Sequence, residues 1–193
     1  MNDAIFLNFP AWLQDEMRRC GDRFADEEAR MAYVIGLSRR NVQEQTGGPF
    51  AAAVFERGSG KLLSMGVNLV MRSNCSHAHA EMIAIAFAEQ RLGSYTLRVD
   101  GEAEYELVTS CEPCAMCFGA IPWSGVTRVV SGAKDADARI IGFDEGPKPR
   151  DWAEALRDRG IEVSEGVCRE AAAAVLEWYA ESGGEIYNGN GAP

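Results

Sequence analysis

The chain has 193 residues, of which 47% are hydrophobic and 25% are charged. This length corresponds to about one average domain, and the composition is that of globular proteins. A disordered chain, a collagen and a coiled coil are therefore excluded. We expect one domain over residues 1–193, with an N-terminal arm over 1–25 and a C-terminal tail over 183–193.

The net charge is −10, from 19 Lys and Arg residues against 29 Asp and Glu residues. A field of this sign repels polyanions, so the charge argues against nucleic acid as a partner. No run of 18 apolar residues is present, which argues against a membrane span. The first ten residues lack the basic region of a secretion signal. We expect a cytoplasmic protein that binds neither nucleic acid nor membrane.

The predicted elements begin, after the arm, with a helix that starts behind Asp26, a residue type that caps helix N-termini. Gly47-Gly48-Pro49 ends this helix, and residues 50–55 and 62–70 form a hairpin around the turn at 58–60. Helices are then expected at 78–92, 113–124, 133–141, 152–159 and 168–182, with strands at 105–109, 126–131 and 161–164 and a loop at 142–150. This order predicts a three-layer α/β/α sandwich with a mixed five-stranded sheet.

Three of the six cysteines, Cys111, Cys114 and Cys117, lie within seven residues of one another. In a chain without a secretion signal, this clustering points to metal or redox chemistry rather than to disulfides. Pro113 is of a type favoured at the first helical position, so Cys114 and Cys117 are predicted in the first turn of a helix, where the dipole favours thiolates. An iron–sulfur run of this type needs a fourth cysteine followed by proline, which is absent, and we interpret Cys111 as a packed residue.

The second half of the candidate site is His79-Ala80-Glu81, at the start of the preceding predicted helix. His79, Cys114 and Cys117 together give three zinc ligands, and an open fourth position marks a catalytic rather than a structural zinc. A water there loses a proton near neutral pH, and Glu81 is the nearest base. We expect the two helix starts to meet at the carboxyl edge of adjacent parallel strands. A redox use of the cysteine pair is the alternative, but it leaves His79 and Glu81 without a role.

The pattern His79-x-Glu81, followed by Pro113-Cys114-x-x-Cys117, resembles the signature of the cytidine deaminase-like superfamily of zinc deaminases. The resemblance extends over about residues 27–145 and includes residues 48–52, Asn68 and residues 110–117. It implies one Zn²⁺ per chain and hydrolytic deamination of a base. The non-enzymatic alternative, a structural zinc domain, does not explain Glu81 or a set of only three ligands.

Members of the superfamily act on different bases, and residues 141–147 resemble a segment of its bacterial guanine deaminase branch. In that branch the segment supplies carboxylates, here Asp144 and Glu145, to the base. Carboxylates suit guanine because its edge carries several hydrogen-bond donors. The resemblance implies conversion of guanine to xanthine and ammonia, with zinc-hydroxide attack at C2. Glu81 then protonates N3 and, with Glu145, moves protons to the departing amine.

The same resemblance suggests how the base is held. Asn68 and Asp144 would bind its edges, and Phe50 and Phe143 would pack on its faces. From the residues alone, Asn68 could instead be a turn residue, Phe50 part of the core, and the two carboxylates surface charges.

The resemblance also implies a homodimer whose C-terminal segments, including residues 186–188, lie near the partner's site. It further implies a side activity on triazines such as ammeline. The rival substrates are guanosine and cytosine or cytidine. Adenosine in tRNA is the weaker rival, because it calls for a positive surface.

Overall fold

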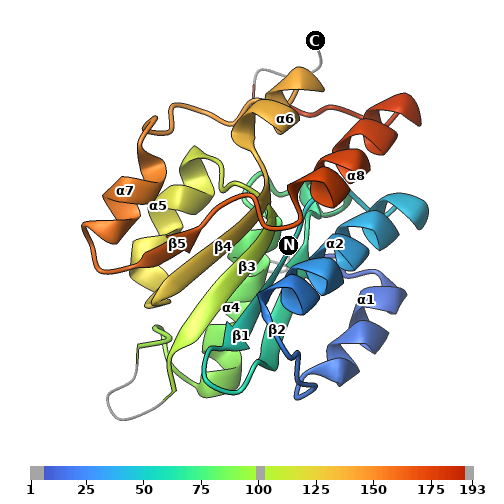
Figure 1. Ribbon diagram of the computed structural model, residues 1–193. Helices are drawn as coiled ribbons and strands as arrows, with labels where there is room; N and C mark the ends of the chain where they lie inside the picture. The colour runs from blue at the N-terminus through green and yellow to red at the C-terminus, as the bar shows by residue number, and fades with distance from the viewer. Residues whose placement is uncertain (1–6, 99–102, 190–193) are drawn as a thin grey trace, which may run out of the picture.

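Five strands form one mixed sheet, in the order β2-β1-β3-β4-β5, in a computed structural model that describes residues 7–98 and 103–189 (Figure 1). The strands are β1 (Ala51–Glu56), β2 (Lys61–Val67), β3 (Tyr105–Cys111), β4 (Arg128–Ala133) and β5 (Glu162–Ser164). β1 runs antiparallel to both β2 and β3, whereas β3, β4 and β5 are parallel. The predicted mixed sheet of five strands is therefore confirmed.

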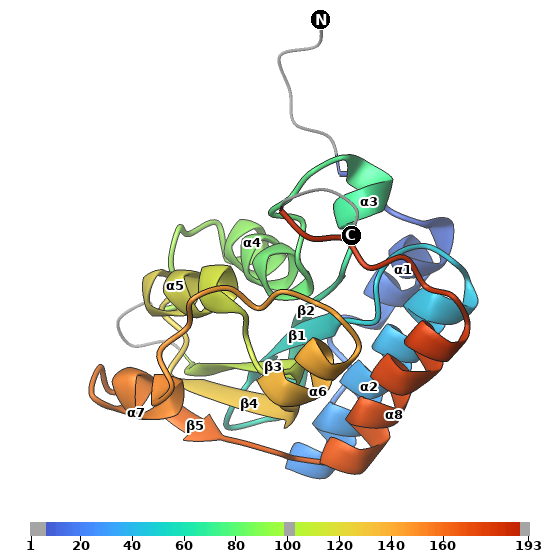
Figure 2. The ribbon, with the colours of Figure 1, turned by 90° about the horizontal axis from the view of Figure 1, so that it is seen from above.

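Helices cover both faces of this sheet. They are α1 (Ala11–Glu16), a 3-10 turn at Met17–Arg19, α2 (Glu27–Gln43), α3 (Val70–Ser73), α4 (Ala80–Leu92), α5 (Ala115–Ser124), α6 (Asp135–Ile140), α7 (Trp152–Arg157) and α8 (Arg169–Glu181). Seen from above, the sheet lies between α4 and α5 on one side and α2 and α8 on the other (Figure 2). None of the helices among the described residues is both long and apolar enough to span a membrane.

The two helical layers follow from the alternation of side chains along the buried strands. In β1, Ala51, Ala53 and Phe55 belong to one apolar cluster, together with residues of α2 and α8. The intervening Ala52 and Val54 belong to a second cluster, with residues of α4, α5 and α7. The sheet is thus buried on both faces, and the predicted three-layer α/β/α sandwich is confirmed.

The N-terminal arm differs from its prediction because part of it is helical. In α1, Trp12 and Leu13 are buried against the core, and the indole of Trp12 donates a hydrogen bond to Thr46 Oγ1 at 3.0 Å. The next helix behaves as expected: Asp26 caps α2 by accepting from the backbone N–H of Ala29 at 2.8 Å. The short α1 was missed because its apolar residues were too few to show a helical period.

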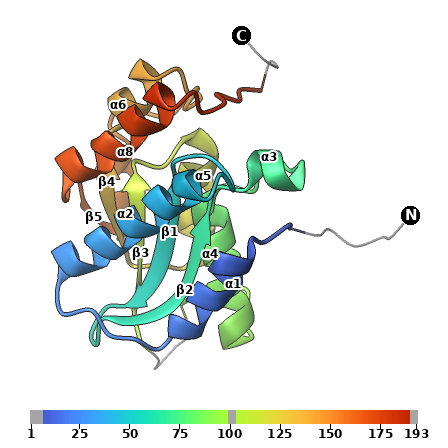
Figure 3. The same ribbon diagram turned by 90° about the vertical axis from the view of Figure 1, so that its right-hand side faces the viewer.

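The second hairpin strand is shorter than predicted. It ends at Val67, and the Asn68 side chain then accepts a hydrogen bond from the backbone N–H of Val70 at 3.3 Å, which turns the chain into α3. Such local bonds from an Asn side chain compete with strand pairing. The short α3 stands apart from the sheet (Figure 3).

The prediction that the two site helices follow adjacent parallel strands was wrong. α4 follows β2 and α5 follows β3, and these strands run in the same direction with the antiparallel β1 between them. The starts of α4 and α5 meet nevertheless, because α4 packs closely on the sheet. A Cβ added at Gly66 in β2 would lie 2.3 Å from the carbonyl oxygen of Ala80, so only glycine permits this approach.

Candidate active site

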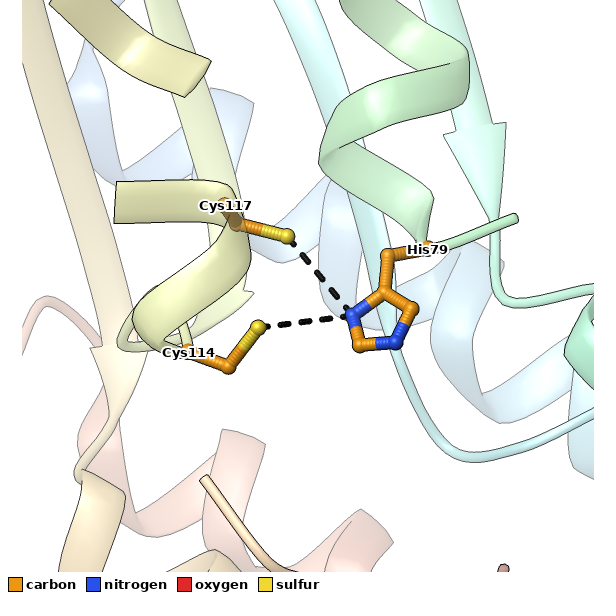
Figure 4. A group of neighbouring side chains, drawn as sticks. All are labelled: His79, Cys114 and Cys117. Carbon is orange, nitrogen blue, oxygen red and sulfur yellow. Dashed lines mark hydrogen bonds between the residues drawn. The ribbon is translucent and has the colours of Figure 1, made fainter. Parts of the chain in front are cut away.

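His79, Cys114 and Cys117 converge at the starts of two helices (Figure 4). His79 is the N-cap residue of α4, and its Nδ1 lies 3.5 Å from the Sγ of Cys114 and 3.6 Å from the Sγ of Cys117. Tetrahedral zinc, with bonds of about 2.0–2.1 Å to nitrogen and about 2.3 Å to sulfur, holds such atoms about 3.5 Å apart. The three donors therefore fit a zinc ion.

The prediction of Pro113 as the first helical residue was wrong, because α5 begins at Ala115 with Cys114 as its N-cap. Both thiols still lie at the helix start, since Cys117 is in its first turn. Hydrogen bonding with Cys117, and then with His79, lowers the pKa of the Cys114 thiol to about 4 against the effect of burial. A thiolate beside an imidazole is the donor chemistry that zinc requires.

Glu81 lies in the first turn of α4, two residues beyond His79, and is 7% exposed. Thr109 Oγ1 at the end of β3 donates to its Oε1 at 3.3 Å, and the Cys117 thiol donates to its Oε2 at 3.4 Å. Burial raises the pKa of this carboxyl, with the negative charge of Cys114 adding to the effect. Glu81 thus stands beside the metal ligands without belonging to their cluster.

The same residues open onto a cavity of about 530 Å³. Apart from Cys117, which is fully buried, every site residue predicted from the sequence lines it. Those lining residues are Phe50, Asn68, His79, Glu81, Cys114, Phe143, Asp144 and Glu145. A cavity of this size suits a small ligand.

Asn68 is 1% exposed, and the chain around it is fixed by a second buried amide, that of Asn41. Asn41 Nδ2 donates to the carbonyl oxygens of Asn68 at 3.0 Å and Gly48 at 2.8 Å. Phe50 and Phe143 contact each other edge to face, with ring centroids 4.9 Å apart. The two aromatic rings therefore form one corner of the cavity rather than two opposed faces.

Glu145 and Asp144 differ sharply in environment although they are neighbours. Glu145 is 6% exposed, and burial, together with the negative charges of Cys114 and Glu81, raises the pKa of its carboxyl to about 8. Its carbonyl oxygen accepts from the backbone N–H of Ala115, the first residue of α5, at 2.9 Å. The Asp144 side chain is 60% exposed and accepts from the N–H of Gly146 at 2.9 Å. Both residues line the cavity, and Glu145 is the buried one of the two.

Three lining residues that the predicted site set lacked, Tyr187, Asn188 and Gly189, come from the C-terminal tail. Tyr187 contacts the Phe143 ring edge to face at 5.4 Å, and burial raises the pKa of its phenol well above the usual value. Asn188 accepts from the N–H of Asp144 at 2.9 Å and donates to the carbonyl oxygen of Gly142 at 3.1 Å. In this structure the tail thus lines the cavity of its own chain. The resemblance had placed residues 186–188 near the partner's site, whereas the apolar pair in this glycine-rich segment does not by itself reveal its target.

Comparison with known proteins agrees with this geometry. The family model for the cytidine and deoxycytidylate deaminase zinc-binding region matches residues 25–133. The structure of guanine deaminase from Nitrosomonas europaea is 47% identical, with a TM-score of 0.90 over 94% of this chain and 98% of that one. A structure of NE0047 with 2,6-diaminopurine, also 47% identical, has a TM-score of 0.91 and covers 98% of this chain and 100% of that one. Guanine deaminase of Bacillus subtilis is 38% identical over 62% of this chain and 72% of its own length. The chain therefore belongs to the family of zinc-binding deaminases defined by the cytidine and deoxycytidylate deaminases.

Proposed function

We propose that this protein hydrolyses guanine to xanthine and ammonia. The observation that carries the proposal is the pair of buried carboxylates, Glu81 and Glu145, that line one cavity with the ligands His79 and Cys114. Two carboxylates can serve as proton acceptor and donor on opposite sides of a reacting carbon. The likeness to guanine deaminases supports guanine as the base.

In the proposed mechanism, His79, Cys114 and Cys117 hold the zinc, which when bound acts as a Lewis acid that makes water nucleophilic near neutral pH. Glu81 accepts a proton as the water oxygen bonds to C2 of guanine, and it delivers that proton to N3. The proton of the new C2 hydroxyl then passes to the amine, the C2–N bond breaks, and ammonia leaves as C2 becomes a carbonyl. Glu145 holds the amine and assists this second proton transfer.

The remaining side chains of the cavity would orient the purine. The Asn68 side chain offers both a hydrogen-bond donor and an acceptor. Its position is fixed because the Asn41 amide donates a hydrogen bond to the Asn68 carbonyl oxygen. Phe50 and Phe143 supply apolar contact for the ring. Asp144 reaches the base from the exposed rim of the cavity. Fixing the base in this way holds C2 next to the metal site.

A substrate panel tests the proposal. We expect guanine to be deaminated with a higher kcat/KM than guanosine, cytosine, cytidine or adenine, by at least about tenfold for each hydrogen bond that the competitor cannot make. Ammeline is expected to react more slowly than guanine. Ammonia release from the purified zinc-loaded protein measures all of these rates. A strong preference for cytidine would overturn the assignment.

We also propose a homodimer in the cytoplasm; the C-terminal segments were expected near the partner's site, but residues 187–189 line the cavity of their own chain. The support in the fold is α5, which carries Cys117 and leaves the indole of Trp123 83% exposed. Aromatic residues, Trp among them, are enriched at protein–protein interfaces. Light scattering should give about twice the chain mass of 21.0 kDa. A strictly monomeric and fully active protein would contradict the dimer.

A further inference from the structure

Lys148 is a buried lysine in the loop that carries Glu145. Its side chain is only 5% exposed. The ammonium nitrogen lies 3.3 Å from Glu112 Oε2, 3.3 Å from Asp135 Oδ1, and 5.0 Å from the centre of the Trp152 ring. A buried ammonium is costly unless it is paired, so this arrangement of two carboxylates and a ring is a specific cation site built for the lysine.

The two carboxylates join Lys148 to the metal site. Glu112 lies between the end of β3 and the ligand Cys114, and it is itself buried. The backbone N–H of Asp135, at the start of α6, donates to Glu112 Oε2 at 3.3 Å. Lys148 therefore ties the segment that leads into the zinc ligands to the start of α6.

The same residue is three positions beyond Glu145, and the chain between them is held closely. The backbone N–H of Lys148 donates to the carbonyl oxygen of Gly146 at 3.0 Å, and Arg139 Nη2 donates to the same oxygen at 3.0 Å. Gly146 has φ of +70°, and a Cβ there would lie 2.9 Å from the Cβ of Ala115. Glu145 is thus placed by a short, tightly packed segment that is fixed at Lys148.

We propose that Lys148 is a positioning residue for the deamination, which joins the loop of Glu145 to Glu112 and so fixes Glu145 against the metal ligands. The role of Glu145 in this inference rests on the proposed function. Without the ammonium, Glu112 and Asp135 face each other without a shared cation. The loop then relaxes, and Glu145 moves from its place in the cavity.

A double-mutant cycle of Lys148→Met and Glu145→Gln separates positioning from general stability. We expect Lys148→Met to lower kcat for guanine by at least about tenfold with little change in KM, since small displacements of a reacting group are costly. Because Lys148 acts through Glu145, the double variant should be within about threefold of Glu145→Gln alone. Losses that multiply in the double variant would overturn the proposal. Lys148→Arg, which keeps the charge, should recover part of the rate, and no recovery would also count against it.

A further measurement, amide hydrogen exchange, keeps the test independent of activity. Amide hydrogen exchange of the peptide covering residues 142–149 should accelerate in Lys148→Met, at unchanged zinc content, and unchanged exchange would overturn the proposal. Lys61→Met, at the exposed start of β2, is the matched control and should leave both exchange and rate unchanged. If Lys148→Met does not fold, Lys148→Gln takes its place. Should the wild-type protein release no ammonia from guanine, the proposed function fails, while hydrogen exchange still decides whether Lys148 fixes the loop.

Discussion

Replacing Glu81 by Gln is expected to lower the deamination rate of guanine by at least about 10²–10⁴, the usual contribution of a general acid–base group. Gln has the same shape, so the hydrogen bond from Thr109 to Oε1 at 3.3 Å can be kept. It cannot accept the proton of the attacking water. Single-turnover rates of ammonia release from the purified variant measure the loss.

The informative control is metal content. Glu81 stands outside the ligand cluster of His79, Cys114 and Cys117, so Glu81→Gln should retain about one zinc per chain. His79→Ala, by contrast, removes a ligand and should lose zinc and activity together. Elemental analysis of both variants separates the two effects. Near-full activity of Glu81→Gln would show that the deaminase mechanism is wrong.

The metal site was predictable because its geometry is local. Cys114 and Cys117 share one helix start, and His79 and Glu81 share another, so sequence spacing alone places each pair. Only the approach of the two helix starts is non-local. The joint motif indicated that the two helix starts meet. The strands that precede the helices, however, were wrongly expected to be neighbours in the sheet.

The position of the tail at the cavity of its own chain and the pairing of the buried lysine could not be predicted from the sequence, for the opposite reason. Tyr187 reaches the cavity from a segment far along the chain from Asn68 and Phe143. In the sequence, Lys148 is an ordinary charged residue in a proline-containing loop. Its buried ion pairs with Glu112 and Asp135 become visible only in the folded structure. Contacts between distant segments leave no periodic pattern in a sequence.

The distinction between Asp144 and Glu145 was likewise decided by the fold. From the sequence, both carboxylates were expected to contact the base, with different roles. The structure buries Glu145 and leaves the side chain of Asp144 60% exposed. A hydrogen bond to an exposed carboxylate competes with water, whereas one inside a cavity does not. The two neighbouring residues should therefore contribute very unequally to catalysis.

Glu145→Gln is expected to reduce kcat for guanine by about 10²-fold, because the amide still fills the space but no longer transfers a proton to the departing amine. The residue is not a metal ligand, so zinc content should be unchanged. Asp144→Asn is the matched control variant. Because the Asp144 side chain is exposed, we expect kcat/KM to fall only a fewfold, mainly through a higher KM. Steady-state kinetics of the wild type and both variants, with zinc determined on the same samples, make the comparison. Equal kcat values for the wild type and Glu145→Gln would remove Glu145 from the mechanism, because a buried carboxylate that exchanges protons with the substrate cannot be replaced by an amide without loss of rate.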